Sequence, residues 1–222
     1  MQELKAGEEL NLFIDVTQGN EFAKSVFDME PLADNTRVEM TQGELAPFVR
    51  EFVLRKSAKL CLTYKVTRVT AWQETCIVRL AGEGASVKIR GIMHGQAEAD
   101  LQYFLTVRHE ADATESEIEF RGVAEDKSHL VLDGLIQAPE GCKGIVANLQ
   151  NKNLLLSNLA IVEARPRLEI DTDDVVCRHG ATVGDLDSNQ LFYLMSRGMT
   201  EQEAREILIE AFLDFIEGGE TR

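Results

Sequence analysis

The chain lacks any long apolar run. None of its 222 residues fall in a stretch approaching the roughly 18 consecutive apolar residues of a membrane-spanning helix. The first residues, Met1–Glu9, include acidic side chains and no apolar core, so they match neither a secretion signal nor an organelle transit peptide. The sequence therefore predicts a cytoplasmic protein that does not associate with a membrane.

Basic residues are also scarce. The chain has 23 Lys and Arg against 38 Asp and Glu, for a net charge of −15. Binding to nucleic acid or to an anionic membrane surface requires clustered positive charge, which argues against both classes of partner. Solubility alone explains the acidic excess, and a basic partner surface is the other possibility.

The cysteines have none of the close spacings typical of a disulfide framework or a zinc site. Cys61, Cys76, Cys142 and Cys177 are far apart, and no Cys-x-x-Cys occurs. In a reducing compartment we expect free thiols, most of them packing residues. Cys142 is a weaker functional candidate, because it lies in a turn-like stretch beside Lys143, which could lower its pKa.

No catalytic set is recognisable. Gly180 and Gly184 are not followed by the Lys and Ser or Thr of a Walker A motif, and Ser157 and Ser196 have no neighbouring acid and base. We therefore expect no enzyme and no ATP hydrolysis. A catalytic pair of carboxylates, as in a β-helix glycosidase or lyase, stays a possibility, because a sequence does not show which carboxylates lie close in space. A β-solenoid binding module or carbohydrate-active enzyme is thus the alternative function.

Short β-like segments fill the chain from Ala58 to Ile170. They are rich in Val, Ile, Leu, Phe and Thr, and turn residues separate them. Hairpin dipeptides are missing apart from Asp133-Gly134, which favours a solenoid over a meander of tight hairpins. Periodicity alone does not separate a solenoid from a sandwich. The segments are Leu60–Val69, Cys76–Leu80, Val87–Met93, Tyr103–Val107, Ile118–Val123, Leu130–Ile136, Leu154–Leu156 and Leu168–Ile170.

Residues 1–57 give a weaker pattern. Leu10–Val16 alternates between apolar and polar residues, and Arg37–Met40 and Phe48–Leu54 are further strand candidates. Glu21–Met29 is either a short helix or a loop. We expect a partly β segment over residues 1–57, a core over 58–184 and a helical region over 185–222.

Two helices are predicted in that last region. Asp187 is an N-cap with Gln190 three residues on, which begins a helix at about 188–197. Thr200 and Glu203 form a capping box for a second helix over about 201–217, and Gly198 suits the end of the first. The apolar stripe of the second helix must be buried against the β array or against a partner.

Cys177 and His179 lie where the β pattern meets the helices, next to Asp171, Asp173 and Asp174. In an extended segment, residues two apart point to the same face. A thiol beside an imidazole could bind iron or sulfur, and an imidazolium would favour the thiolate. From spacing alone, however, a packing role for the cysteine is the commoner outcome.

The stretch Cys177-Arg-His-Gly-Ala-Thr-Val-Gly184, followed by Leu191-Phe-Tyr-Leu194 and Ser196-Arg-Gly198, resembles the SufB/SufD family of iron–sulfur cluster assembly scaffolds. The resemblance is dense from Asn153 to about Glu217 and thinner back to about Ala58. It is nearer SufD in its His-Gly-Ala-Thr-Val-Gly. It implies a mainly β fold, a right-handed parallel β-helix with a C-terminal two-helix cap. Family members are longer and carry an N-terminal helical region without a counterpart here.

The resemblance also implies a function. The chain would be a non-catalytic scaffold subunit that binds a SufC-like ABC ATPase and a second SufB/SufD-like subunit, as a homo- or heterodimer. A transient iron–sulfur cluster would form at the subunit interface, handled by Cys177 and His179. His109 matches a family histidine, although a hydrogen-bonded structural histidine is the simpler interpretation. The ATPase would contact the helices at Leu191, Tyr193, Arg197 and Glu201.

Overall fold

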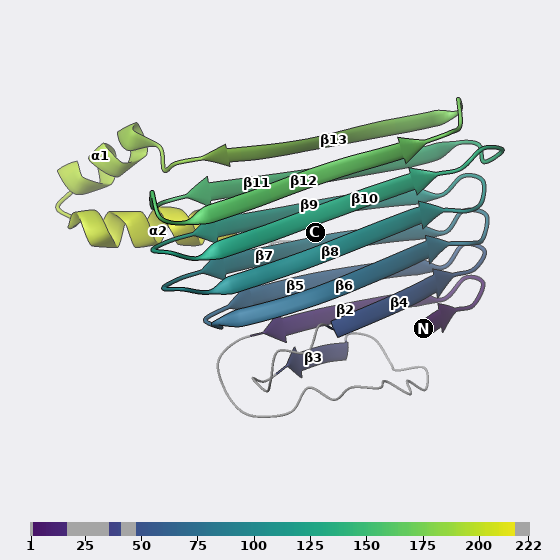
Figure 1. Ribbon diagram of the computed structural model, residues 1–222, viewed down its shortest axis with the longest axis horizontal. Helices are drawn as coiled ribbons and strands as arrows, with labels where there is room; N and C mark the ends of the chain where they lie inside the picture. The colour runs from purple at the N-terminus through teal and green to yellow at the C-terminus, as the bar shows by residue number, and fades with distance from the viewer. Residues whose placement is uncertain (1, 17–35, 41–47, 216–222) are drawn as a thin grey trace.

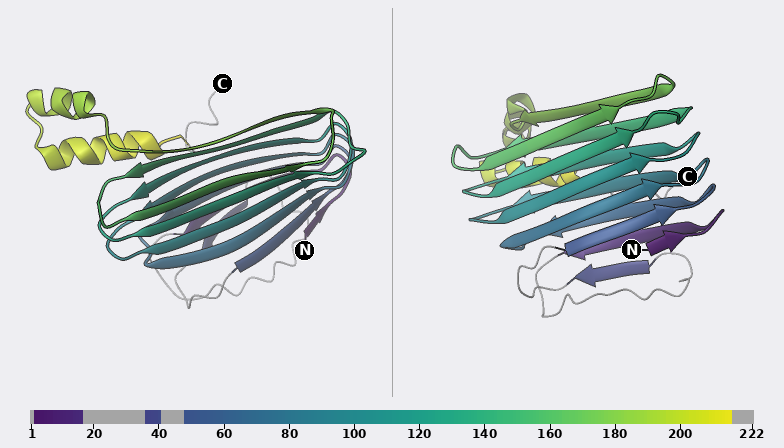
Figure 2. Two further views of the ribbon diagram at one scale, coloured as in Figure 1. Left: turned by 45° about the horizontal axis from the view of Figure 1, so that its top comes forward. Right: turned by 45° about the vertical axis from the view of Figure 1, so that its right-hand side comes forward.

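The protein is a parallel β-solenoid with two helices at its C-terminal end (Figures 1 and 2). The computed structural model describes residues 2–16, 36–40 and 48–215. Two sheets face each other, and the chain passes from one to the other after almost every strand. Sheet A has the order β1-β4-β6-β8-β10-β12, and sheet B has the order β13-β11-β9-β7-β5-β2-β3.

The strands of sheet A are β1 (Gln2–Leu4), β4 (Phe48–Leu54), β6 (Ala71–Leu80), β8 (Asp100–His109), β10 (His129–Ala138) and β12 (Ile161–Ile170). The strands of sheet B are β2 (Glu9–Val16), β3 (Thr36–Met40), β5 (Lys59–Thr67), β7 (Ser86–Gly95), β9 (Glu115–Ala124), β11 (Ile145–Leu155) and β13 (Val175–Gly184). Two helices follow, α1 (Ser188–Ser196) and α2 (Glu201–Leu213).

Every described strand pair is parallel and in register. Asp100 lies beside Ala71 on one side and His129 on the other, so one turn of the solenoid takes 29 residues at this point. Because side chains alternate between faces, in-register stacking places inward residues in columns that run through the core. One such column contains Ile89, Ile118 and Leu149, all of which are buried. The predicted parallel β-helix is therefore confirmed.

Aromatic rings fill the middle of the core. Trp72 stacks on Tyr103 with ring centroids 5.7 Å apart, and Tyr103 packs on Phe120 at 4.9 Å. Gly91 makes room for this group, since a Cβ atom there would lie 2.0 Å from the Phe120 ring. Beside the rings, the buried Glu74 carboxylate accepts hydrogen bonds from Arg50 and Tyr64, at 2.7 and 2.8 Å. Burial nonetheless raises the pKa of Glu74, because it penalises the charged form more than these partners favour it.

Each predicted strand segment overlaps an observed strand, but Leu60–Val69 runs two residues past the end of β5 and Leu154–Leu156 runs one residue past the end of β11. Asp133-Gly134, the one hairpin dipeptide, lies inside β10, which agrees with the predicted segment Leu130–Ile136. Gly134 faces Leu149, whose Cδ1 would be 2.6 Å from an added Cβ. Strand β13 extends over Val175–Gly184, beyond the predicted segments. The possible helix at Glu21–Met29 lies outside the described residues.

Both helices begin where their caps predict. Asp187 accepts from the amides of Asn189 and Gln190, and Thr200 and Glu203 form the reciprocal capping box. Gly198 follows α1 with a φ of 96°, which a glycine adopts without strain. Helix α2 ends at Leu213, earlier than predicted, with Asp214 as its C-cap. Among the described residues, no helix is long and apolar enough to cross a membrane.

Candidate functional site

Cys177 and His179 lie on β13, the last strand of sheet B (Figure 1). Cys177 is in register with Ala147 of β11, and His179 is in register with Leu149. Ala147 and Leu149 are inward and buried, so the Cys177 and His179 side chains belong to the inner face of the sheet. The expectation that the two share one face is met by this register.

The layer formed by β12 and β13 has no further turn stacked on it in the part of the chain that is described. In β11 the five inward residues from Ile145 to Asn153 are all buried. Their register partners in β13 are half-buried or exposed, and Val183 is 50% exposed. The inward residues of β12, from Val162 to Ile170, are half-buried. The solenoid therefore ends in a partly apolar layer that contains the Cys177 and His179 side chains.

The Cys177 thiol is not activated in the isolated chain. Cys177 packs on the edge of the main core, and this burial raises its pKa, while the Arg178 amide lowers it only in part. The imidazole of His179 is not among the groups that shift the pKa of Cys177, so a thiolate favoured by an imidazolium stays a prediction. Side chains two apart on one strand are separated by roughly 7 Å, and His179 is exposed with no contact to the sulfur among the described interactions.

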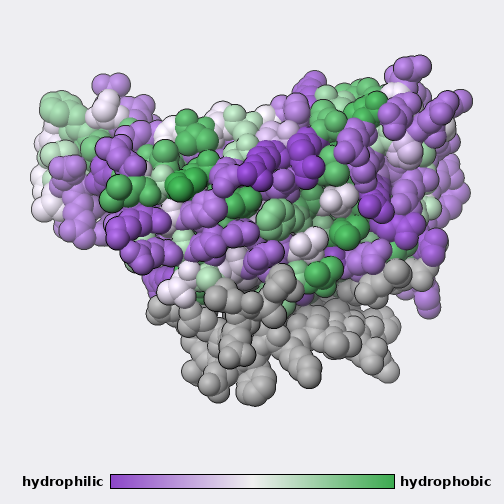
Figure 3. Space-filling model, in the orientation of Figure 1, coloured by the Kyte–Doolittle hydropathy of each residue, from purple (hydrophilic) through white to green (hydrophobic). Residues whose placement is uncertain are grey.

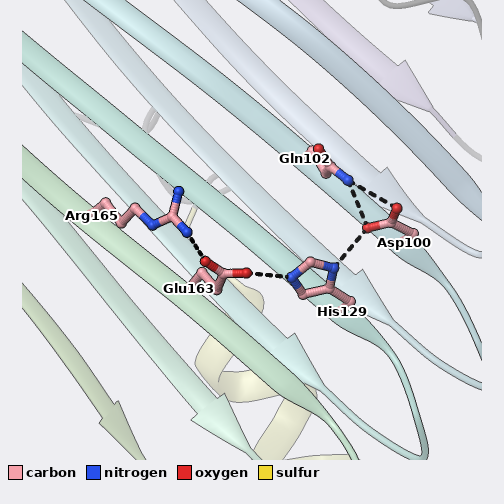
Figure 4. A network of polar contacts seen from close by, with 5 residues as sticks. All are labelled: Asp100, Gln102, His129, Glu163 and Arg165. Atoms are coloured by element: carbon pink, nitrogen blue, oxygen red, sulfur yellow. Dashed lines mark hydrogen bonds and ion pairs between the residues drawn. The ribbon is translucent and has the colours of Figure 1, made fainter.

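Neighbouring strands hold this end layer in place. On β11, the Asn153 amide donates to the Thr182 carbonyl of β13 at 3.2 Å. On the outer face of sheet A, the His129 ring lies between Asp100 and Glu163, at 3.1 and 2.9 Å (Figure 4). Glu163 also pairs with Arg165, so this network joins β8, β10 and β12. The hydrogen bond between His129 and Glu163 lowers the pKa of Glu163. These contacts tie both edge strands to the strands beside them.

His109 is a buried, hydrogen-bonded residue of the core. It is fully buried at the end of β8, with Nδ1 2.8 Å from the Thr114 hydroxyl and Nε2 2.9 Å from the Ser116 hydroxyl. Thr114 donates its own proton to the Ala111 carbonyl, so Nδ1 carries the hydrogen and Nε2 accepts from Ser116. Burial lowers the pKa of His109 to about 4. A neutral histidine with both nitrogens satisfied has no free position for a ligand.

Cys142 is likewise a packing residue. The sequence suggested an exposed turn, but Cys142 is buried in a small cluster with Ala138 and Ile145. Burial raises the pKa of its thiol, and the charges of Asp112 and Glu110 add to the increase. The predicted lowering of the pKa by Lys143 is therefore wrong, because burial and the acidic neighbours raise it.

The four predicted partner residues lie on or beside the helices. Helix α1 has no buried residue; Phe192 and Tyr193 are 72% and 57% exposed. Arg197 is exposed with its guanidinium 5.2 Å from the Tyr193 ring, Glu201 is exposed at the start of α2, and Leu191 is half-buried. In the space-filling view, apolar surface lies on the protruding helical region (Figure 3). This surface and Cys177 are at opposite ends of β13, roughly 23 Å apart along the strand.

Helix α2 is anchored to the solenoid by Arg121 on β9, a residue that the sequence reasoning missed. Its guanidinium donates to the Phe212 carbonyl at 2.7 Å and lies 4.1 Å from the centre of the Phe215 ring. It also bonds Glu119, which Lys152 of β11 contacts at 3.2 Å. Although burial raises the pKa of Glu119, these two cations hold it below the ordinary value. No sequence pattern signals such an arginine, because Phe212, whose carbonyl it contacts, is 91 residues away.

The described residues contain no group of three or more His, Cys, Asp or Glu side chains arranged to hold a metal ion. Cys177 and His179 therefore offer two ligands from one strand, and Asp171, Asp173 and Asp174 do not join them in such a group.

Comparison with known proteins identifies relatives for most of this chain. The family model described as "SUF system FeS cluster assembly, SufBD core domain" matches residues 32–212. The iron–sulfur cluster assembly protein SufD of Escherichia coli is 34% identical over 134 residues, covering 60% of this chain and 32% of the relative. SufD of Bacillus subtilis is also 34% identical over 134 residues, covering 60% and 31%.

A SufBD family protein of Synechocystis is 32% identical over 121 residues, which is 54% of this chain and 26% of the relative. The chain thus matches about a third or less of the length of these curated relatives.

The environment of His109 predicts a loss of stability in acid. A histidine with a folded pKa of about 4 and an ordinary value of 6.5 binds its proton more readily when unfolded. Its contribution is fully present above pH 6.5 and is lost as the pH falls towards 4. The loss amounts to about 3 kcal/mol of unfolding free energy. Urea unfolding of wild type and His109→Gln across this range should show a shallower pH dependence in the variant.

His179→Gln is the matched control, since it makes the same change at an exposed position. It should keep the wild-type slope. Equal slopes in wild type and His109→Gln would mean that the buried imidazole does not contribute to acid sensitivity.

Proposed function

This chain belongs to the SufBD core-domain family of iron–sulfur cluster assembly proteins, and from that membership we propose that it is a non-catalytic scaffold subunit. In this proposal a second SufB/SufD-like subunit covers the end layer formed by β12 and β13. An ABC-type ATPase of the SufC kind binds the helical region. An iron–sulfur cluster is the cargo, assembled between the two scaffold subunits and then passed on. Family membership argues against an unrelated solenoid module or a carbohydrate-active enzyme.

The uncovered end layer is the observation that carries the proposal. Strands β12 and β13 each present one unpaired edge in the described structure, and exposed strand edges favour pairing with another chain. Their inward apolar residues, such as Val162, Leu168 and Val183, are only partly buried, so a docked subunit would remove more apolar surface from water. Cys177 and His179 belong to the same layer, so docking would enclose them.

The ligand count explains why an interface is needed. Iron in protein-bound clusters generally has four ligands, commonly thiolates with occasional imidazoles. Cys177 and His179 supply two, so the partner subunit or sulfide must supply the others. The raised pKa of Cys177 adds a second requirement, because only the thiolate binds metal or sulfur efficiently. A cationic group or the iron itself, brought by the partner, would stabilise that thiolate.

The first test removes the two candidate ligands. Cys177→Ser and His179→Ala change little buried area, so both variants should dimerise and bind the ATPase as wild type does. Anaerobic reconstitution of the full complex with iron and sulfide should then give at least about tenfold less cluster absorbance in each variant. Cys142→Ser is the control for loss of a thiol, since Cys142 packs in a separate cluster. Cluster formation at the wild-type rate in both variants would assign this pair a purely structural role.

The helical region supports the second part of the proposal. Helix α1 has no buried face, and its aromatic residues Phe192 and Tyr193 are among the most exposed apolar side chains described. Aromatic residues beside an arginine are common at the energetic centres of interfaces. Arg197 lies next to Tyr193, which gives this surface such a centre. Helix α2 then connects the surface to sheet B through Arg121.

The second test reverses charge at this surface. Arg197→Glu and Glu201→Lys alter exposed side chains, so the fold should be unchanged. Binding of the ATPase, measured by titration calorimetry, should weaken by roughly tenfold or more in Arg197→Glu and less in Glu201→Lys, which lies at the edge. Lys56→Glu and Glu83→Lys provide controls at an exposed ion pair on the turns at the other end of the strands. Wild-type affinity in both helix variants would place the ATPase interface elsewhere.

A further inference from the structure

A large groove lies along one side of α2, on the outer face of sheet B. Its volume is about 1520 Å³, which exceeds the roughly 300–1,000 Å³ of a typical small-molecule pocket. One wall is α2, and the floor is built from the ends of β5 and β7. We propose that this groove binds an amphipathic helix of a partner protein, with basic residues along the flank that faces α2. The groove lies along α2 and not on the exposed face of α1; it shares Glu201 with the expected ATPase surface, and its test uses no ATPase.

The position of α2 defines the space for such a helix. The second half of α2 packs on Val123 of β9 and Leu154 of β11, and Arg121 fixes it there. The groove floor lies on β5 and β7, with β5 two strands from β9. Two strand spacings are about 9.6 Å, which matches the 8–10 Å between the axes of packed helices. A second helix placed on β5 and β7 would therefore lie beside α2 at an ordinary packing distance.

The bottom of the groove provides apolar contact. Ile92 of β7 points outward, and Ile209 and Leu213 of α2 face it. These three side chains are buried, so the apolar strip still open to a partner consists of Ile207, which is 41% exposed, and Ala211 on the α2 wall. A helix with leucine or isoleucine at i, i+3 and i+4 would continue this strip.

The α2 wall sets the charge of the occupant. Glu206, Glu210 and Asp214 follow at i, i+4 and i+8, so they form one exposed acidic line along the groove. Glu206 accepts only from Gln202, and no cation among the described residues pairs with Glu210 or Asp214. Lysines or arginines on the facing flank of a docked helix would pair with this line, as charges flanking a coiled-coil seam do.

The opposite side of the groove limits the basic residues to one flank. Arg68 lines that side just past the end of β5, and His94 pairs with Glu125 at 2.6 Å on the floor. A helix that was basic all round would be repelled there. The occupant is therefore an amphipathic helix with basic residues on one flank and neutral or acidic residues on the other.

Two synthetic peptides test this chemistry on the full chain. Both carry the same leucine stripe and glutamines on the far flank; one has lysines on the near flank and the other has glutamates. The lysine peptide should bind at least about tenfold more tightly at low salt, and added salt should weaken it. In the Glu206→Lys, Glu210→Lys double variant the preference should invert. The Asp173→Lys, Asp174→Lys double variant makes the same change in net charge on a distant turn and should keep the wild-type preference.

The NMR signals of the imidazoles localise the binding. Ring resonances of His94, on the groove floor, should shift when the lysine peptide is added, while those of His179 should not. No binding, equal binding of both peptides, or binding without a His94 shift would overturn the proposal. Binding that appears only after removal of residues 216–222 would make the chain's own end the occupant and would also overturn it. Thermal unfolding of each double variant at the wild-type temperature confirms that the fold is retained.

Discussion

In-register stacking of each strand on the strand one turn earlier is the constraint on which the structure depends. Parallel strands satisfy their backbone groups only through a neighbour on each side, and here that neighbour is the same part of the preceding or following turn. The same stacking buries inward columns such as Ile89, Ile118 and Leu149. The next residue in that column is His179, where the described stacking ends. His179 is exposed because it lies in the last layer, whereas its register partner one turn earlier, Leu149, is a core residue.

The candidate cysteine and the two helices lie at different ends of strand β13. Cys177 is near the start of β13, whereas α1 and α2 follow from its other end (Figure 1). The helices are thus distant from the thiol, but they follow the same strand and contact the outer face of sheet B through Arg121. Asn153 and Lys152 are neighbours on β11, the first bonded to Thr182 of β13 and the second to Glu119 of β9. The edge strand and the helical anchor therefore share one strand as their support.

Much of the fold could be predicted from local patterns. Alternation in Leu10–Val16 correctly predicted the strand β2, and the caps at Asp187 and Thr200 predicted the helix starts. The parallel arrangement came from the resemblance, because alternation is the same in a sandwich and a solenoid. Asp133-Gly134 shows the limit of a dipeptide signal: the glycine is required by the approach of Leu149, which is distant in sequence.

For the candidate site too, local patterns predicted some features and long-range contacts determined the others. The spacing of Cys177 and His179 correctly placed both on one face of an extended segment. The pKa values of Cys142 and Cys177 could not be predicted, because burial depends on which turn covers each thiol. His109 looked like any histidine on a strand, and only the folded structure brings the Thr114 and Ser116 hydroxyls to its two nitrogens. Long-range contacts decided each of these outcomes.

Hydrogen–deuterium exchange of the backbone amides of β12 and β13 tests the central claim most directly. Within the described structure of the isolated chain, each of these two strands is hydrogen-bonded to a neighbour along one edge only. The backbone amides that point to the unpaired edge should therefore exchange quickly. Adding a second SufB/SufD-like subunit should slow exchange along both strands, with the largest protection around Cys177 and His179. Unchanged exchange in β12 and β13 in the presence of a bound second subunit would show that the scaffold does not assemble through this end of the solenoid.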